Sequence, residues 1–298
     1  MPDPSDTPPT VRRILVVGVG RMGGGLARNL CRHGSFDVTV FDRSEAAVAR
    51  CVEAGAAAAA SVTEAAVDVD LVVSSLPMPA DVVELVDEIA PHLQPGALVM
   101  DTSTIDPATA GRVAAVVGER RFVSCLLGKG PAQAEAGEVP LFVGGHDAAL
   151  EALAPVFECI GERVHRLGSV EAATAFKLVS NLIGMANLAV LAEGYALCRD
   201  AGVGDADFTD ALRDTGAWSY QAEVRLPWMI DGDFDARFAV TLALKDLALA
   251  VDMAARRRIP APVGAAAMSQ LAAAAAHGHG DLDAAAVLRL VAPLDDGG

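Results

Sequence analysis

The stretch "RRILVVGVGRMGGGLARNL" (12–30) decides the fold of the first part of the chain. Residues 12–20 form a short run rich in Val and Ile that ends in glycine, and the residues from 21 onward have the apolar periodicity of a helix. Three glycines in a GxGxxG pattern join the two segments: Gly18, Gly20 and Gly23. Such glycines permit a tight turn and let a pyrophosphate approach the helix N-terminus. The triplet alone is a weak signal, since an ordinary glycine-rich turn also contains it. The strand–turn–helix context favours a dinucleotide-binding βαβ unit.

The second predicted strand, 36–44, carries an acid at the expected distance. Asp42 lies 19 residues after Gly23, where a carboxylate binds the adenosine ribose hydroxyls. Arg43 follows, and it either meets a 2′-phosphate or is a solvated surface residue. Because the carboxylate would repel a 2′-phosphate, the pair favours NAD over NADP.

Further short apolar strands alternate with helices as far as about residue 145. The strands are expected at 69–77, 96–104, 121–128 and 139–145, and the helices at 45–55, 80–93 and 107–118. Alternation of this kind, with strands apolar on both faces, is typical of helices covering a mostly parallel sheet. The predicted fold class is α/β, with an N-terminal Rossmann-type doubly wound sheet.

The pattern changes near Gly168 to long alanine-rich helices. They are expected at about 170–201, 205–215, 218–230, 239–258, 261–277 and 283–291. We therefore predict an all-α C-terminal domain, and the first of its helices, about 30 residues long, as a spine between the domains. The domains are expected as a disordered leader at 1–10, a dinucleotide-binding domain at 11–166 and a helical substrate and dimerisation domain at 167–298.

The composition limits the partners. A formal charge of −16 argues against nucleic acid and anionic membranes. No apolar run reaches the roughly 18 residues of a membrane span without a charge or turn signal, and the acidic, proline-rich start is no signal peptide. Five scattered cysteines indicate reduced thiols in a cytoplasm. "HGHG" (277–280) has no cysteine or acid cluster near it, so a polar turn is favoured and no metal is predicted.

Lysine is rare in this chain. The 23 basic residues are 20 arginines and three lysines: Lys129, Lys177 and Lys245. Lys177 stands in the apolar helical stretch "TAFKLVSNL" (174–182), and Asn181 follows at i+4 on the same helix face. A lysine in a low-dielectric cleft loses part of its preference for the charged form, which suits proton transfer near neutral pH. Arginine stays protonated, so it cannot replace lysine in this role. A lysine that reaches from the helix to solvent is the alternative.

Six motifs occur in one order over nearly the whole chain. They are "GVGRMG" (18–23), "SLPMP" (75–79), "DTSTIDP" (101–107), the glycine-containing segment 128–137, "KLVSN" (177–181) and "LKDL" (244–247). The ordered set resembles the β-hydroxyacid dehydrogenase family, whose members include relatives of 3-hydroxyisobutyrate dehydrogenase and 6-phosphogluconate dehydrogenase.

The resemblance implies an NAD(P)-dependent oxidoreductase that interconverts a 3-hydroxy acid and its semialdehyde or keto acid. Lys177 matches the catalytic lysine and Asn181 its companion. Asp101, Thr102, Ser103 and Thr104 match the segment that binds substrate. The residues implied in cofactor binding are Gly18, Gly20, Arg21, Met22, Gly23, Asp42, Arg43, Leu76, Pro77, Thr104 and Lys245. The family also implies a small anionic substrate in a cleft between the domains, and a homodimer or homotetramer formed through the helical domain.

The segment "LLGKG" (126–130) departs from the family pattern. Gly128 stands where a serine is common, and Lys129 where a glycine is common. The family holds the substrate carboxylate with backbone amides here, which Gly128 and Gly130 still allow. Lys129 would add a cation for a second anionic group of the substrate, or else point to solvent. A pairing of Lys129 with Glu171 is a further possibility.

Two aromatic residues, Trp218 and Tyr220, lie in "DTGAWSYQAE" (214–223). They are expected either to line an apolar part of the substrate pocket or to pack as ordinary helix residues; we include Trp218 among the substrate-binding candidates. Two other functions stay open. Imine reductases share the architecture but generally lack the lysine at the position of Lys177. A non-catalytic NAD(P)-binding protein is the other alternative.

Overall fold

The computed structural model describes residues 10–33 and 35–292. The predicted leader 1–10 therefore lies, apart from Thr10, outside the described residues. Contacts divide the chain into two compact units, Met1–Lys177 and Leu178–Gly298. Each unit is described by itself below.

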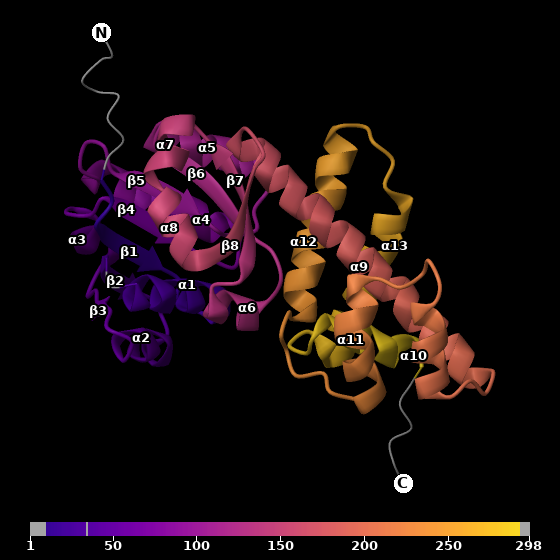
Figure 1. Ribbon diagram of the computed structural model, residues 1–298. Helices are drawn as coiled ribbons and strands as arrows, with labels where there is room; N and C mark the ends of the chain where they lie inside the picture. The colour runs from indigo at the N-terminus through magenta and orange to yellow at the C-terminus, as the bar shows by residue number, and fades with distance from the viewer. Residues whose placement is uncertain (1–9, 34, 293–298) are drawn as a thin grey trace. The chain divides into compact units, whose positions relative to one another are not determined.

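The N-terminal unit is built on one eight-stranded sheet with the strand order β3-β2-β1-β4-β5-β6-β7-β8 (Figure 1). The strands are β1 Arg13–Val17, β2 Asp37–Phe41, β3 Ala57–Ala58, β4 Leu71–Ser74, β5 Leu98–Asp101, β6 Phe122–Leu127, β7 Val139–Gly145 and β8 Gly161–Arg166. The strands from β1 to β6 pair in parallel, β7 is antiparallel to β6, and β8 is parallel to β7. The order reverses at β1, as in a doubly wound sheet. The predicted Rossmann-type fold is confirmed.

Helices cover both faces of this sheet. They are α1 Arg21–Arg32, α2 Glu45–Val52, α3 Val62–Ala66, α4 Pro79–Ile89 with the short η2 Ala90–His92, α5 Pro107–Val117, α6 Pro131–Ala136, α7 Asp147–Ala152 and α8 Ala154–Ile160. Along β1, Ile14 and Val16 face a core formed with α1, α2, α6, α7 and α8. Leu15 and Val17 face the opposite core, formed with α3, α4 and α5. Alternate residues thus enter two different cores, which explains why the strand is apolar throughout.

Two edge strands escape prediction from the sequence. β3 is two exposed alanines, and β8, "GERVHR", is polar and mostly exposed. Strand prediction relies on apolar alternation, and neither segment has any. Both strands lie at the ends of the sheet, where one side has no partner strand.

The helix α9 Val170–Asp200 begins inside the packing of the N-terminal unit. Val170 is buried in the core with α4 and α5, and the Thr174 hydroxyl donates to the Val170 carbonyl beside Ser124. The division therefore falls after Lys177, whereas the change in composition predicted a boundary near residue 166. The composition changes where the last strand ends. The first two turns of α9 still pack against the N-terminal unit, so the division by contacts falls later in the chain.

The helical unit comprises the rest of α9 and the helices that follow. These are α10 Asp205–Arg213, α11 Tyr220–Asp231, α12 Val240–Arg256, α13 Pro262–Ala274, η3 Ala275–His279, η4 Ala284–Val287 and α14 Leu288–Val291 (Figure 1). Tyr195, Leu226, Met229, Leu247 and Leu271 are among its buried core residues. The prediction of an all-helical second part is confirmed, and the predicted helices agree with those observed to within a few residues at most ends.

By length and composition, α9 is apolar enough to cross a membrane, and it is the one such helix in the described part of the chain. The expectation that no apolar run of about 18 residues is free of a charge or turn signal still holds for α9, because Lys177 and Glu193 bound its uncharged stretch at 178–192. Leu178, Leu188, Ala192 and Tyr195 of this helix are buried in the protein. A core helix has the same composition, so length and hydropathy alone do not indicate a membrane.

Candidate functional site

The glycine turn between β1 and α1 has the geometry that its pattern predicts. Gly18 has a φ of +84°, and a Cβ placed on it would lie 2.4 Å from the Ser75 carbonyl oxygen. A Cβ on Gly23 would lie 2.0 Å from the Gly18 carbonyl oxygen. Around Gly20, in contrast, no atom lies within 4 Å of the Cβ position, and no side chain caps α1 there. The turn thus packs tightly on the protein side and is open at the helix N-terminus, where a pyrophosphate fits.

Asp42 holds the end of β2 against this turn. One carboxylate oxygen accepts a hydrogen bond from the Val19 amide, and the other accepts one from the Ser44 amide, both at 2.8 Å. Each carboxylate oxygen has a further lone pair for a hydroxyl. Arg43 is exposed beside it. Of the other residues predicted in the turn, Arg21 is exposed and Met22 is half-buried.

The ends of β4 and β5 are joined by a buried hydroxyl network. The Asp101 carboxylate oxygen Oδ1 accepts hydrogen bonds from the hydroxyls of Ser74 and Ser103, each at 2.7 Å. The Ser103 oxygen in turn accepts from the Leu76 amide at 2.8 Å, and Thr102 donates to the Ser74 carbonyl. Ser103 is 3% exposed and its hydroxyl proton points to Asp101. The predicted substrate ligand Ser103 therefore acts here as a link between strand ends.

Three neighbours of this network match predicted cofactor and substrate positions. A Leu76 methyl carbon lies 3.0 Å from the Cβ position of Gly18, so this leucine packs on the glycine turn. Pro77 is exposed and Thr104 is half-buried, each just beyond the carboxyl end of a parallel strand. The predicted cofactor residues of the N-terminal unit thus gather at one edge of the sheet.

Two backbone amides of the "LLGKG" segment, those of Gly128 and Gly130, have protein partners. The Gly128 amide donates to the Pro140 carbonyl at 2.9 Å, which extends the β6–β7 ladder, and the Gly130 amide donates to the Gln133 side chain at 3.3 Å. A Cβ on Gly128 would lie 2.5 Å from the Pro140 ring, so serine does not fit there without a shift. In this arrangement a ladder partner occupies the Gly128 amide, and the expectation that the amides around Gly128 to Gly130 hold the substrate carboxylate stays a prediction.

Lys129 also has partners within its own unit. Its ammonium lies 2.7 Å from a Glu162 carboxylate oxygen and donates to the Glu138 carbonyl at 3.0 Å. The suggested pairing with Glu171 is wrong, since the carboxylate of Lys129's ion pair comes from β8. Glu171 instead lies beside Gly111 of α5.

Lys177 reaches the carboxyl end of β6 from the second turn of α9. Its Nζ donates to the Leu127 carbonyl oxygen at 2.8 Å, and the side chain is half-buried. Since β6 is parallel to β5, Leu127 ends at the edge of the sheet where Asp101 ends. The structure therefore brings the predicted catalytic amine to the same edge as the strand-end network.

Two further predicted residues share a buried carboxylate in the helical unit. The Asn181 amide donates to Asp246 Oδ2 at 2.6 Å, and Lys245 Nζ lies 3.0 Å from Asp246 Oδ1. Asp246 is 2% exposed. Sequence reasoning named Asn181 and Lys245 but missed Asp246. The signal was available, because Asp246 is an acid inside the apolar helical run "LALKDLALA" (242–250).

Trp218 packs at the edge of the helical core. It is partly buried there, and the Arg213 guanidinium lies 5.0 Å from the centre of its ring. Tyr220, at the start of α11, is half-exposed. These contacts account for Trp218 as a packing residue; its predicted contact with substrate stays a prediction.

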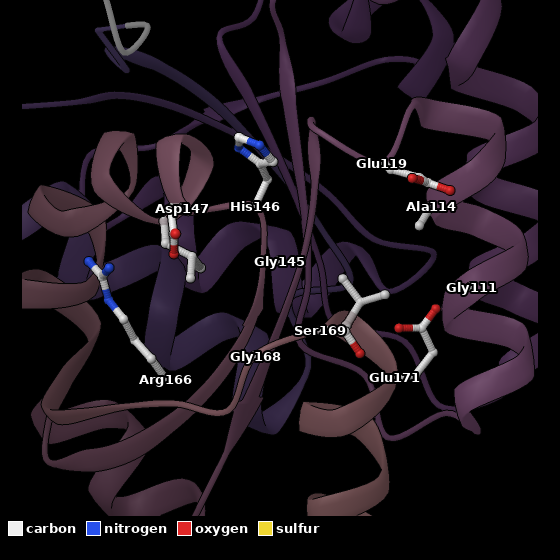
Figure 2. A pocket seen from close by; sticks show the side chains of 12 residues that line it. Gly111, Ala114, Glu119, Gly145, His146, Asp147, Arg166, Gly168, Ser169 and Glu171 are labelled. Carbon is white, nitrogen blue, oxygen red and sulfur yellow. The ribbon is translucent and has the colours of Figure 1, made fainter. Parts of the chain in front are cut away.

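A hollow of about 570 Å³ lies elsewhere on the N-terminal unit, around the end of β7 and the start of α9. Figure 2 shows Arg166 and Asp147 on one side of it and Glu119 and Glu171 on the other. Gly145 in its wall pairs with Val123 at the beginning of β6, so the hollow lies at the opposite edge of the sheet from Leu127. It is separate from the residues predicted to act in chemistry.

Comparison with known proteins places the chain in a family. A family model for the NAD-binding domain of 6-phosphogluconate dehydrogenase matches residues 13–168. A second, for the NAD-binding of NADP-dependent 3-hydroxyisobutyrate dehydrogenase, matches residues 172–291. The chain belongs to the β-hydroxyacid dehydrogenase family.

Individual relatives agree with this assignment. The chain is 31% identical to 2-(hydroxymethyl)glutarate dehydrogenase of Eubacterium barkeri, over 93% of this chain and 94% of that protein. The crystal structure of 3-hydroxyisobutyrate dehydrogenase from Salmonella typhimurium matches with a TM-score of 0.84 and 30% identity, over 94% of this chain and 99% of the other. An imine reductase from Pseudomonas sp. shares the fold, with a TM-score of 0.62 and 23% identity over 94% and 99%.

As a β-hydroxyacid dehydrogenase, the protein is an NAD(P)-dependent oxidoreductase that acts on the CH–OH group of hydroxy acids, as the sequence predicted. The open glycine turn and the Asp42 carboxylate fit a dinucleotide cofactor. When bound, the cofactor supplies a nicotinamide that accepts or donates hydride.

Proposed function

We propose that Lys177 is the general acid and base of this dehydrogenase. The observation that carries the proposal is the hydrogen bond from Lys177 Nζ to the Leu127 carbonyl oxygen at 2.8 Å. This hydrogen bond fixes the amine at the carboxyl ends of the parallel strands, where the Gly18 turn and the hydroxyl network around Asp101 also lie. In open α/β sheets this carboxyl edge is where ligands bind.

The proton balance assigns one task to each protein group. In oxidation, the neutral Lys177 amine takes the substrate hydroxyl proton as hydride leaves the same carbon; in reduction, the ammonium returns that proton to the carbonyl oxygen. A carbonyl oxygen accepts a hydrogen from the amine in both protonation states. The Leu127 carbonyl therefore keeps Nζ oriented throughout the cycle. Asn181 orients the reacting oxygen in this proposal, and Lys245, held by Asp246, supplies a fixed positive charge.

We propose a small anionic 3-hydroxy acid as substrate and NAD as the preferred cofactor. Asp42, at the end of β2, would repel a 2′-phosphate, which supports NAD; exposed Arg43 is the residue through which NADP would still bind. If Arg43 does bind the 2′-phosphate, Arg43→Ala should raise the KM for NADP about tenfold and leave that for NAD unchanged.

A substrate panel tests the reaction. Nicotinamide absorbance is followed with 3-hydroxy acids, semialdehydes and cyclic imines, in parallel with NAD and NADP. We expect turnover of one or more 3-hydroxy acids, and Lys177→Ala should lower their kcat by about a thousandfold, with Lys177→Arg no better. Imine reduction by Lys177→Ala at the wild-type rate would instead indicate an imine reductase. Tight NADH binding without any turnover would indicate a non-catalytic protein.

We further propose a homodimer or homotetramer assembled through the helical unit, in the cytoplasm. The support is a stripe of exposed apolar residues at heptad spacing on α9: Ile183, Val190 and Leu197, which are 54%, 62% and 71% exposed. Monomers seldom leave such a stripe uncovered. Light scattering should give a multiple of the 30.6 kDa chain, and Val190→Glu with Leu197→Glu should yield the monomer. Five free thiols are consistent with a reducing compartment.

A further inference from the structure

Lys129 has a backbone conformation that L residues rarely adopt. Its φ is +55°, and among the described non-glycine residues only Arg258, at +56°, also has a positive φ. Arg258 follows Arg257, the C-cap residue of α12, and this is a common place for a left-handed residue. Lys129 lies instead between β6 and α6, so tertiary contacts must hold it.

The Lys129 side chain supplies those contacts. Its ammonium lies 2.7 Å from Glu162 Oε1 on β8 and donates to the carbonyl of Glu138, the residue before β7, at 3.0 Å. One side chain thus joins its own turn to the edge strand β8 and to the residue before β7. With one third of the side chain exposed, the ion pair is screened in part.

The turn controls a peptide plane that faces Lys177. The peptide between Leu127 and Gly128 is planar, so its N–H and C=O point in opposite directions. The Gly128 N–H donates to the Pro140 carbonyl on β7, and the Leu127 C=O accepts from Lys177 Nζ at 2.8 Å. Rotation of this plane would break both hydrogen bonds. The backbone of residue 129 is the next link of the chain, and its left-handed turn leads into α6.

We propose that Lys129 is a positioning residue for Lys177, and this inference rests on the proposed role of Lys177 as acid and base. The ion pair with Glu162 holds residue 129 in the left-handed turn. That turn keeps the Leu127–Gly128 plane in register with β7, and the Leu127 carbonyl keeps the Lys177 amine aimed. Lys129 acts through the backbone, without contact with the substrate.

A positioning role and a substrate-binding role of Lys129 predict different results when the residue is replaced by glycine. Glycine adopts a positive φ without help from a side chain. Lys129→Ala should therefore release the turn and lower kcat about tenfold, with the KM for the hydroxy acid changed less than about twofold. Lys129→Gly should restore kcat to within about threefold of wild type. Glu162→Gln, which leaves Lys129 in place, should lower kcat about threefold.

A second readout reports on Lys177 without turnover. The chain has only three lysines, so trace acetylation with acetic anhydride followed by peptide mass spectrometry resolves each amine. The labelling rate of Lys177 is divided by that of Lys245 in the same sample. This ratio should change about threefold or more in Lys129→Ala and should match wild type in Lys129→Gly. Arg258→Ala is the matched control, since it alters the other positive-φ residue and should leave kcat and the ratio unchanged.

The outcomes separate the two proposals. Equal rises in KM for Lys129→Ala and Lys129→Gly, with kcat kept, would overturn the positioning role in favour of substrate contact. Unchanged kcat and an unchanged ratio in Lys129→Ala would overturn it outright. If the wild type turns over no hydroxy acid, the proposed function fails, while the labelling ratio still decides whether Lys129 sets the environment of Lys177. Thermal melts of each variant identify any loss of folding.

Discussion

Each unit of the protein buries one carboxylate among predicted site residues, and the two have different partners. Asp101, 1% exposed in the N-terminal unit, accepts from the Ser74 and Ser103 hydroxyls and the Ser103 amide. Asp246, 2% exposed in the helical unit, lies between the Asn181 amide and the Lys245 ammonium.

The difference separates two uses of a buried acid. Around Asp101, neutral donors tie the end of β4 to the residues after β5, so the carboxylate fixes the shape of the sheet edge. Beside Asp246 there is a cation, and a buried ammonium without its counter-ion is strongly unfavourable. Asp246 therefore holds the Lys245 ammonium in place, whereas the hydroxyls that donate to Asp101 fix the conformation of the ends of β4 and β5.

Asp246→Ala should have the largest effect, because it leaves the Lys245 ammonium, whose side chain is 12% exposed, without its carboxylate. We expect the free energy of unfolding of the helical unit to fall by about 3 kcal/mol. We also expect kcat/KM to fall by about a hundredfold, since Lys245 and Asn181 both lose their partner. Denaturant unfolding followed by circular dichroism gives the first quantity and initial rates give the second.

A paired replacement separates charge from packing. Lys245→Met with Asp246→Leu removes both ions and should recover most of the lost stability, since apolar pairs often replace buried ion pairs at little cost. Turnover should stay low, because the fixed charge is gone. Recovery of both stability and turnover would show that Asp246 matters only as a structural residue.

The sequence specifies much of the fold because apolar periodicity is a local signal. Alternating strands and helices predict the doubly wound sheet and the helical unit, and "GVGRMG" (18–23) predicts the turn at Gly18. β8 carries no such signal, and its position depends on pairing with β7. The end of the N-terminal unit at Lys177 likewise depends on contacts that the first turns of α9 make with distant strands.

The residue types of the candidate site were predictable from the sequence. The hydrogen-bond and ion-pair partners of these residues were less so. Lys177 stands out because lysine is rare and because its helix is apolar. Nothing local shows that its acceptor is the carbonyl of Leu127, 50 residues earlier. The same holds for Lys129 and Glu162, 33 residues apart. The family resemblance implies that the amides around Gly128 to Gly130 bind substrate. A glycine-rich loop gives no sign that a neighbouring strand extends its ladder to the Gly128 amide.

The helical unit also buries a hydroxyl that can ionise, unlike the serines at Asp101. Burial, and then its hydrogen bond to Asp205, raise the pKa of Tyr195 to about 12 from the ordinary 10.0. The folded state thus retains a proton that the unfolded chain releases first. Its stabilising contribution is fully present below about pH 10 and is lost as the pH rises through about 12. The free energy of unfolding should fall by about 2 kcal/mol over that window.

Tyr195→Phe should flatten this alkaline slope in the helical unit. Unfolding curves at several pH values between about 10 and about 12 measure the slope for both proteins. The buried thiols of the N-terminal unit are present in both, so their contribution cancels in the difference. Identical slopes would mean that Tyr195 loses its proton as readily in the folded chain as in the unfolded one.

The smallest effects should come from the neutral donors at Asp101. Ser74→Ala removes one hydrogen bond to Oδ1 and leaves the Ser103 hydroxyl and amide in place, so unfolding should cost only about 1 kcal/mol less than in wild type. Ser103→Ala should destabilise by a similar amount, but it also removes the acceptor of the Leu76 amide, beside the glycine turn. We therefore expect Ser103→Ala to raise the KM for the cofactor about threefold and Ser74→Ala to leave it unchanged. If Ser103 binds substrate directly, as the family resemblance implies, the KM for the hydroxy acid will rise instead, and the hydroxyl must then turn away from Asp101 during catalysis.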